Sequence, residues 1–187
     1  LSDVPYVASF YGQDAASDVP NNPRTYSYLF EHADRITVLS EDMLNDLETN
    51  GCPEGKTGIQ PLPVDTNEFK PSQANKHAAG SVEIVTVARF VEKKGLDDAL
   101  AAVKAVSGEY DVCWRIAGDG PLRDRFESEL IERGLTNVVE PLGLVSQEEI
   151  QKLLTEADVF LLPSKRARSG DKEGTPTVLL EAQAAGV

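Results

Sequence analysis

The sequence has few cysteines, no long apolar run and too few basic residues to balance its acids. Cys52 and Cys113 fit neither a disulfide framework nor a metal site, which favours a reducing, cytoplasmic location. The longest apolar runs, such as Val159–Leu162, are far too short to span a bilayer. With 31 acidic against 18 basic residues, the net charge of −13 disfavours nucleic acid and anionic membranes as general partners.

Two nucleotide-binding motifs are also missing. No Gly-x-Gly-x-x-Gly follows the first strand-like segment of either half, which disfavours a dinucleotide-dependent dehydrogenase. No Gly-x-x-x-x-Gly-Lys-Ser/Thr occurs, which excludes a P-loop enzyme. The strongly acidic composition suits a high-salt cytoplasm and equally an ordinary acidic bacterial protein, and the sequence leaves both open.

Strand-like and helix-like segments alternate along the whole chain. Helical spacing and caps predict helices between the strands, with Ser40 and Ser146 as N-caps and Glu149 completing a capping box. This alternation predicts an α/β fold with parallel, Rossmann-like sheets. The expected strands are residues 4–10, 36–39, 59–62, 82–88, 111–117, 137–143 and 158–162.

A polar, non-periodic stretch divides the chain. "KPSQANKHAAGS", residues 70–81, is the best linker candidate. It predicts that residues 1–70 are the end of one domain, 71–81 a linker, and 82–187 a second domain. In parallel sheets every loop that follows a strand lies at the carboxyl edge, where ligands bind.

Two of these loops carry residues suited to phosphate. Arg89 and Lys94 follow the strand at 82–88, and such cations hold phosphate oxygens, although a solvated basic turn has the same composition. Gly118 and Gly120 follow the strand at 111–117 and allow close approach of a ligand to the backbone, although a tight turn also needs glycine.

A third loop leads into the final helix. Thr175 is the expected N-cap and Pro176 the first helical residue, so the free amides of Thr177 and Val178 would form an anion site. Glu173 lies just before this helix and Glu181 about two turns inside it. Carboxylates beside a phosphate site suit sugar or ribose hydroxyls, although each glutamate alone is also typical of a helix surface.

Four segments in order and spacing then resemble a known family. "ARFVEKKGLDDAL", "IAGDGPL", "ADVFLLPS" and "EGTPTVLLEAQAAGV" resemble the donor-binding half of glycosyltransferase family 4, which are retaining enzymes of the GT-B fold. The Glu173-x7-Glu181 pair matches that family's signature. "SFYGQDAA" resembles its His-Gly-x-Asp segment, with Tyr11 in the His position, and Pro63 replaces a frequent Gly. Several stretches look most like enzymes that build exported polysaccharides.

The resemblance implies a role for each matched residue. Arg89 and Lys94 would bind the donor diphosphate, and Glu173 hydroxyls of the transferred sugar. Glu181 would bind the ribose. The Tyr11 substitution puts in doubt any role that needs an imidazole. The remaining implied donor contacts are Gly12, Gly118, Gly120, Leu144, Val145, Gly174, Thr175, Pro176 and Thr177.

The implied reaction is sugar transfer from a UDP-sugar or GDP-sugar to a hydroxyl of a glycan or lipid-linked acceptor, with retention, in polysaccharide or glycoconjugate synthesis. No Asp-x-Asp pair occurs, so no metal and no further cofactor is expected. A nucleotide-sugar epimerase of similar build and a binding-only nucleotide-diphosphate module remain alternatives. The basic residues Lys165, Arg166 and Arg168 are expected to form a solvated loop or to meet an anionic acceptor.

The family pattern also implies that both ends of the sequence are cut. Residues 1–70 would be the last part of the acceptor-side domain, and the donor domain would continue beyond Val187. The isolated chain is therefore expected to be inactive, with exposed sheet edges through which copies could self-associate. A longer protein is expected in the cytoplasm, or peripheral to the inner face of the membrane.

Overall fold

The computed structural model of the protein describes residues 4–12, 14–71 and 80–187. These residues form two compact units. Unit 1 comprises the chain up to Pro63 together with Arg166–Pro176, and unit 2 comprises Val64–Lys165 together with Thr177–Val187. Most of the predicted linker, 72–79, lies outside the described residues.

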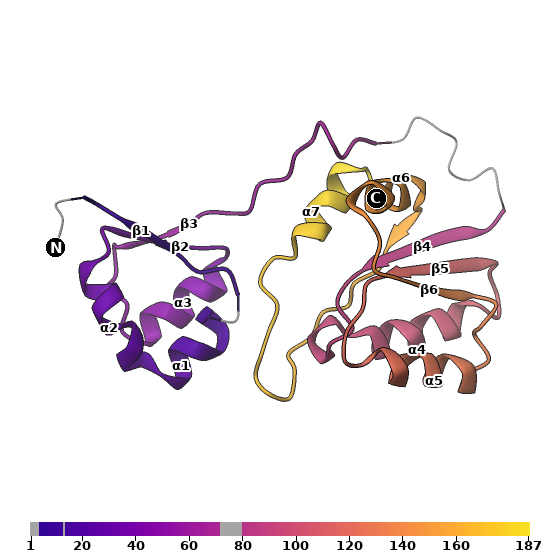
Figure 1. Cartoon of the computed structure of the whole chain (residues 1–187), viewed down its shortest axis with the longest axis horizontal. Helices are drawn as coiled ribbons and strands as arrows, with labels where there is room; N and C mark the ends of the chain where they lie inside the picture. Colours follow the sequence, from indigo (N-terminus) through magenta and orange to yellow (C-terminus); the bar gives the residue numbers. More distant parts are fainter. Residues whose placement is uncertain (1–3, 13, 72–79) are drawn as a thin grey trace. The chain divides into compact units, whose positions relative to one another are not determined.

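Unit 2 contains a four-stranded parallel sheet in the order β6-β5-β4-β7 (Figure 1). This arrangement confirms the predicted α/β class with parallel strands. Its elements are β4 (Val82–Val87), η3 (Glu92–Lys94), α4 (Leu96–Val106), β5 (Val112–Ala117), α5 (Arg123–Glu132), β6 (Val139–Gly143), α6 (Gln147–Glu156), β7 (Val159–Phe160) and α7 (Thr177–Ala184).

Helices cover both faces of this sheet, with α4 and α5 on one side and α6 and α7 on the other (Figure 1). Trp114 and Ile116 of β5 face the α4–α5 side, whereas Ala117 belongs to the core cluster on the α6–α7 side. This alternation was expected from the period of two along the strand. Trp114 is fully buried, and its indole Nε1 donates a hydrogen bond of 2.9 Å to the hydroxyl of Thr86.

Phe69 explains why unit 2 begins before the predicted linker. Its side chain is 4% exposed and packs in one cluster with Val85, Leu154 and Ala182. Burial of an aromatic side chain contributes a large share of local packing energy. The segment from Val64 to Phe69 therefore joins unit 2, although the sequence pattern had assigned it to the first domain.

Unit 1 contains a three-stranded parallel sheet in the order β1-β2-β3, with helices packed over a core that includes Phe10, Ile36 and Leu47. Ser40 caps α3 as predicted, because its hydroxyl accepts a hydrogen bond from the amide of Met43. The elements are β1 (Val7–Ser9), η1 (Asp14–Asp18), α1 (Val19–Asn21), α2 (Pro23–His32), β2 (Arg35–Val38), α3 (Glu41–Thr49) and β3 (Thr57–Ile59).

Several predicted boundaries differ from the structure. The strand expected at 4–10 spans only Val7–Ser9, and the strand expected at 59–62 instead spans Thr57–Ile59. The strand expected at 158–162 is hydrogen-bonded as a strand only at Val159–Phe160. The carbonyl of Leu161 accepts a hydrogen bond from the hydroxyl of Thr86 instead of continuing the ladder. The last helix begins at Thr177, so Thr175 is not the residue directly before it. That shift of one residue is common at helix ends.

The segment 166–176 is held in unit 1 by a lysine that contacts α3. The ammonium of Lys172 forms ion pairs with Asp42 and Asp46, the latter at 2.6 Å, and its side chain is only 14% exposed. Burial disfavours the charged ammonium, but the hydrogen bonds to the two aspartates outweigh that effect and raise the pKa of Lys172. Asp42 and Asp46 are one helical turn apart, so both carboxylates reach the same cation.

We expect Lys172→Met to loosen this segment. Loss of its charged hydrogen bonds should lower the free energy of opening of residues 166–176 by about 1–2 kcal/mol. Amide exchange in this segment should then be roughly 5- to 30-fold faster. The reporter amides are Ala167, which donates to Asp171 at 2.8 Å, and Gly170, which donates to Ala167 at 2.9 Å. Hydrogen exchange followed by mass spectrometry measures the effect.

The control is Lys152→Met, which removes an exposed ion pair of 3.9 Å on α6 and should leave the segment's exchange unchanged. A raised lysine pKa means that the ion pair is fully formed below the ordinary lysine pKa and is lost only above the raised value. The difference between variant and parent should therefore be constant from about pH 6 to 9. Equal exchange in parent and Lys172→Met would show that the lysine does not hold the segment.

Candidate functional site

The loops at the carboxyl edge of the unit 2 sheet carry about half of the predicted site residues. Arg89 follows β4, Gly118 follows β5, Leu144 follows β6, and Pro163 lies just beyond β7. Because all four strands are parallel, these loops gather at one edge of the sheet. The sequence had predicted this gathering from the alternation of strands and helices.

Gly118 and Gly120 allow the loops after β4 and β5 to touch. A Cβ atom on Gly118 would lie 1.9 Å from the carbonyl oxygen of Ala88, and one on Gly120 would lie 2.7 Å from that of Phe90. Both glycines also have positive φ angles of 138° and 157°. The contact is completed by the amide of Phe90, which donates to the carbonyl of Asp119 at 2.9 Å. Their demonstrated role is therefore loop packing, and contact with a donor stays a prediction.

Gly95 makes a second contact of this kind. Its φ is 65°, and a Cβ atom there would lie 2.0 Å from the carbonyl oxygen of Pro163. The amide of Lys165 donates to the carbonyl of Lys93 at 2.8 Å. The loop that carries Lys94 is thus fixed against the loop after β7. Neither contact was predicted, since each depends on the packing of segments about 70 residues apart in the chain.

The two predicted phosphate ligands lie in these fixed loops. Arg89 has an exposed side chain, and Lys94 is half-buried at the end of η3. Leu144 is 81% exposed, while Val145 is half-buried against the cluster that contains Ala157. The capping box of Ser146 and Glu149 forms as predicted and fixes the chain directly after them. Cations on a fixed loop can bind a diphosphate without ordering the backbone, so that only their side chains lose conformational freedom.

Lys165 is engaged within unit 2. Its ammonium lies 2.8 Å from carboxylate oxygens of both Asp97 and Asp98 near the start of α4. These hydrogen bonds raise the pKa of Lys165. The charge of Lys165 is therefore already balanced by two carboxylates, in ion pairs that stay partly exposed to solvent.

Glu181 lies on α7 in unit 2, about one turn after the helix begins at Thr177. Burial raises the pKa of Glu181, and the nearby carboxylate of Glu68 raises it further. A carboxylate with a raised pKa accepts hydrogen bonds readily, because donors compensate for the water that it has lost.

Glu173 lies in unit 1, on the segment that Lys172 anchors. Its Oε2 atom is buried. The neighbouring Gly174 packs tightly, since a Cβ atom there would lie 3.2 Å from the carbonyl oxygen of Tyr11 and 3.5 Å from side-chain atoms of Leu39 and Met43. The segment 173–174 therefore lies beside the Tyr11 loop.

Asp14 shapes that loop and was not singled out from the sequence. Its carboxylate accepts hydrogen bonds from the amides of Gly12 and Ala15, both at 2.9 Å, and from the amide of Tyr11 at 3.3 Å. An aspartate two residues after Gly12 is the usual signal of such a turn, and it could have been found in the sequence. Lys172 was missed as well, because its partners on α3 are 130 residues away.

The predicted site residues thus fall into two sets. Unit 1 holds Tyr11, Gly12, Glu173, Gly174, Thr175 and Pro176. Unit 2 holds Arg89, Lys94, Gly118, Gly120, Leu144, Val145, Thr177 and Glu181. The structure brings the loops of Gly118 and Gly120 against the loop after β4 in unit 2, and Gly174 against Tyr11 in unit 1, while the donor-binding roles of both sets stay a prediction.

The described residues lack two further kinds of feature. In residues 4–12, 14–71 and 80–187, no group of three or more His, Cys, Asp or Glu side chains is arranged to hold a metal ion. Among the helices of the same residues, none has both the length and the apolar character needed to cross a membrane. Independence from metals stays a prediction.

Comparison with known proteins identifies several relatives. Over 182 residues the chain is 37% identical to the "Putative colanic acid biosynthesis glycosyltransferase WcaL" of Escherichia coli K12, covering 95% of this chain and 44% of that protein. Over 186 residues it is 31% identical to the "Amylovoran biosynthesis glycosyltransferase AmsK" of Erwinia amylovora, covering 97% of this chain and 45% of that protein. The chain thus spans about half the length of the curated relatives it matches.

Solved structures share the fold. The crystal structure of Anabaena Alr3699/HepE in complex with UDP aligns with a TM-score of 0.81 at 18% identity, over 97% of this chain and 51% of that one. Sucrose-phosphate synthase of Thermosynechococcus elongatus aligns with a TM-score of 0.78 at 21% identity, over 100% of this chain and 49% of that one. This likeness confirms the predicted GT-B type of architecture.

The family match covers the carboxyl edge of the unit 2 sheet. Residues 67–187 match the family described as "Glycosyl transferases group 1". That range includes the four loops at the carboxyl edge of the unit 2 sheet and both Glu173 and Glu181, and the chain is therefore a member of the glycosyl transferases group 1 family.

Proposed function

We propose that the protein to which this chain belongs transfers a sugar from a nucleotide-diphosphate sugar to an acceptor hydroxyl, with retention of configuration. The observation that carries this proposal is the packing of the Arg89–Gly95 and Gly118–Gly120 loops at one sheet edge, within a sequence of the group 1 family. Two cations on rigid backbone suit a diphosphate leaving group.

The donor in this proposal is a UDP-sugar or a GDP-sugar. The fold neighbour HepE has been crystallised with UDP and glucose, which supports a nucleotide-sugar donor. In the proposed complex Arg89 and Lys94 bind the diphosphate, and Glu181 accepts a hydrogen bond from the ribose. Glu173 accepts hydrogen bonds from hydroxyls of the transferred sugar. An ionised carboxylate suits both tasks because it only accepts.

In the proposed mechanism the bond between the anomeric carbon and the diphosphate breaks, and the acceptor hydroxyl attacks the same face. Negative charge grows on the leaving diphosphate, while the sugar gains oxocarbenium character. Arg89, Lys94 and the free amides at the start of α7 would stabilise that growing charge. A loop backbone already fixed by packing lowers the cost of positioning these groups in the transition state.

The relatives support a role in polysaccharide synthesis, since WcaL and AmsK are named for colanic acid and amylovoran biosynthesis. The proposed acceptor is accordingly a glycan or lipid-linked glycan. We place the reaction in the cytoplasm, peripheral to the inner face of the membrane where the acceptor is lipid-linked. Self-association through exposed edge-strand residues such as Val7 and Ile59 stays a prediction, which sedimentation of the chain would test.

Calorimetric titration of the chain with UDP and GDP tests the diphosphate assignment. Arg89→Ala and Lys94→Ala should each weaken binding of UDP or GDP, whichever binds, by about 1.5–3 kcal/mol, or roughly 10- to 150-fold, because each removes a charged hydrogen bond. The control Arg125→Ala removes a 72% exposed guanidinium on α5 and should leave affinity unchanged. Unaltered affinity in both site variants would contradict the assignment.

Variants of the two glutamates distinguish contacts to the sugar from contacts to the nucleotide in the same titration. Glu181→Ala should weaken the nucleoside diphosphate and its sugar derivative alike, whereas Glu173→Ala should weaken only the sugar derivative. Product analysis with a labelled nucleotide sugar and the longer protein then tests the reaction. A glycoside supports transfer, an isomerised sugar indicates an epimerase, and an unchanged donor indicates a binding-only module.

The raised pKa of Glu181 predicts opposite effects of pH on binding and on stability. Ribose binding requires the carboxylate, so affinity should fall as pH falls through the raised pKa. In the free protein the desolvated charge costs stability above the ordinary glutamate pKa, and that cost disappears as the group is protonated at low pH. Glu181→Gln should therefore stabilise the unliganded chain at neutral pH but not at acid pH.

Titrations of parent and Glu181→Gln with UDP across pH, together with thermal melts, measure both effects. The terminal phosphate itself titrates near about pH 6 in both cases, so only the difference between the two proteins reports Glu181. Identical pH profiles for parent and variant would exclude Glu181 as the ribose ligand.

A further inference from the structure

The segment that carries Glu173 packs on unit 1, whereas its neighbours along the chain belong to unit 2. Residues Arg166–Pro176 are part of unit 1, while Lys165 before them and Thr177 after them are part of unit 2. All residues of this segment are described, and none of them lies in a helix or strand. The position of Glu173 therefore depends on the contacts that the segment makes in unit 1.

Lys172, directly before Glu173, gives this segment a polar contact with α3. Its ammonium forms ion pairs with Asp42 and Asp46, the latter at 2.6 Å. The side chain of Lys172 is 14% exposed and that of Asp46 is 32% exposed, so water screens this pair less than it screens a surface ion pair. The pair therefore holds the chain at residue 172 against α3.

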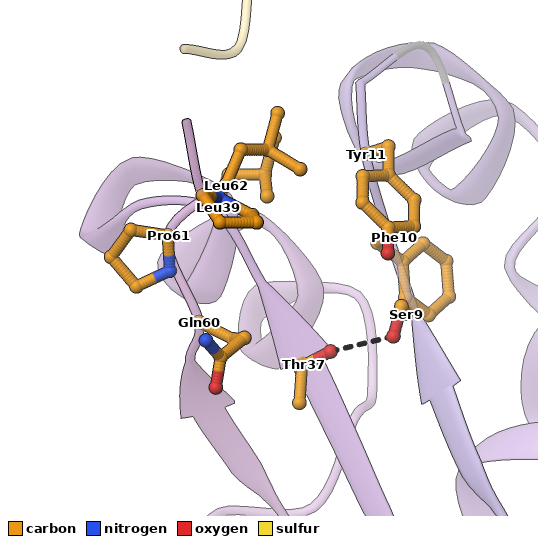
Figure 2. A pocket seen from close by; sticks show the side chains of 9 residues that line it. Ser9, Phe10, Tyr11, Thr37, Leu39, Gln60, Pro61 and Leu62 are labelled. Carbon is orange, nitrogen blue, oxygen red and sulfur yellow. Dashed lines mark hydrogen bonds between the residues drawn. The ribbon is translucent and has the colours of Figure 1, made fainter. Parts of the chain in front are cut away.

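Gly174, directly after Glu173, packs against α3 and the loop after β1. A Cβ atom there would lie 3.5 Å from a side-chain atom of Met43 on α3 and 3.2 Å from the carbonyl oxygen of Tyr11. A side-chain atom of Leu39 would lie 3.5 Å from the same point. Figure 2 shows Tyr11 and Leu39 where they line a recess of unit 1. The backbone at residue 174 is thus fixed as well.

These contacts on both sides of Glu173 restrict the backbone that carries it, and its carboxylate atom Oε2 is buried. A ligand-binding group is effective only when it is held within about 0.5 Å of its productive position. We propose that Lys172 is a positioning residue, which places the Glu173 carboxylate by anchoring the segment to Asp42 and Asp46. The inference rests on the proposed function, in which Glu173 accepts hydrogen bonds from the transferred sugar.

This role predicts an effect that is selective for ligands that carry a sugar. Lys172 lies in unit 1, whereas Arg89 and Glu181, proposed ligands of the nucleotide, lie in unit 2. A looser segment should therefore lower the affinity for a nucleotide sugar and leave the affinity for the nucleoside diphosphate unchanged. A general loss of folded structure would instead lower both affinities alike.

Calorimetric titration of the 187-residue chain with UDP and UDP-glucose, and with GDP and GDP-mannose, measures this selectivity. For the nucleotide that binds, Lys172→Met should reduce the affinity for the nucleotide sugar about three- to tenfold, because the productive arrangement is then populated for less of the time. The affinity for UDP or GDP alone should not change. Lys172→Arg keeps a cation for the two carboxylates and should retain most of the parent's affinity for the nucleotide sugar.

The Glu173→Ala background shows whether Lys172 acts through Glu173. If it does, Lys172→Met should have no further effect on nucleotide-sugar affinity in that background, because the effects of coupled residues are not additive. The control Lys152→Met removes an exposed ion pair on α6 and should change neither affinity. Full additivity of Lys172→Met and Glu173→Ala would overturn the proposal, as would equal nucleotide-sugar affinity in Lys172→Met and the parent.

Asp46→Asn provides a second test if thermal melts show that Lys172→Met does not fold. This variant removes the less exposed carboxylate and leaves the ion pair of Lys172 with Asp42. We expect the affinity for the nucleotide sugar to fall about two- to fivefold, again with no change for the nucleoside diphosphate. Equal nucleotide-sugar affinity in this variant and the parent would overturn the role of Lys172.

Failure of the proposed function has a different signature. A parent chain that binds neither UDP nor GDP would count against nucleotide-sugar transfer, and with it against the role of Lys172. Unaltered nucleotide-sugar affinity in Glu173→Ala would count against the assignment of Glu173 itself. The role of Lys172 alone fails if the parent binds and Glu173→Ala loses nucleotide-sugar affinity, while the Lys172 and Asp46 variants behave as the parent does.

Discussion

The close contact of backbone with backbone at the carboxyl edge of the unit 2 sheet is the constraint on which the candidate donor site depends. Gly118 admits the carbonyl of Ala88, and Gly95 admits that of Pro163, at distances where no Cβ atom fits. These contacts join the loops after β4, β5 and β7 into one rigid rim. The backbone that carries Arg89 and Lys94 is held by packing, so ligand binding does not have to order that backbone.

In unit 1, ion pairs and hydrogen bonds hold two of the predicted site segments in place. Lys172 connects the Glu173 segment to α3 through Asp42 and Asp46, and Asp14 folds the Tyr11 loop through three backbone amides. The tight contact of Gly174 with the Tyr11 carbonyl brings these two features together. Tyr11 also lines a recess with Thr37 and Gln60 at the carboxyl edge of the unit 1 sheet.

Because the chain is strongly acidic, an exposed basic residue matters for attracting an anion. Several basic residues are occupied by carboxylates in the structure, among them Arg115 with Glu83 and Glu156, Arg123 with Glu127, and Lys165 with Asp97 and Asp98. Of the cations expected to bind the donor, Arg89 has an exposed side chain at the sheet edge. In a chain of net charge −13, an anionic donor needs such local positive charge to overcome general repulsion.

Sequence patterns were sufficient to predict the parallel α/β class, the caps at Ser40 and Ser146, and the placement of Arg89, Gly118 and Leu144 after successive strands. Those features follow from local periodicity and from the geometry of parallel strands, which short segments encode. Long-range packing, by contrast, joins Phe69 to unit 2, brings Lys172 to α3, and balances Lys165 with Asp97 and Asp98. Each of these contacts joins residues far apart in the chain, and a single sequence carries no signal for which distant partners will pack together.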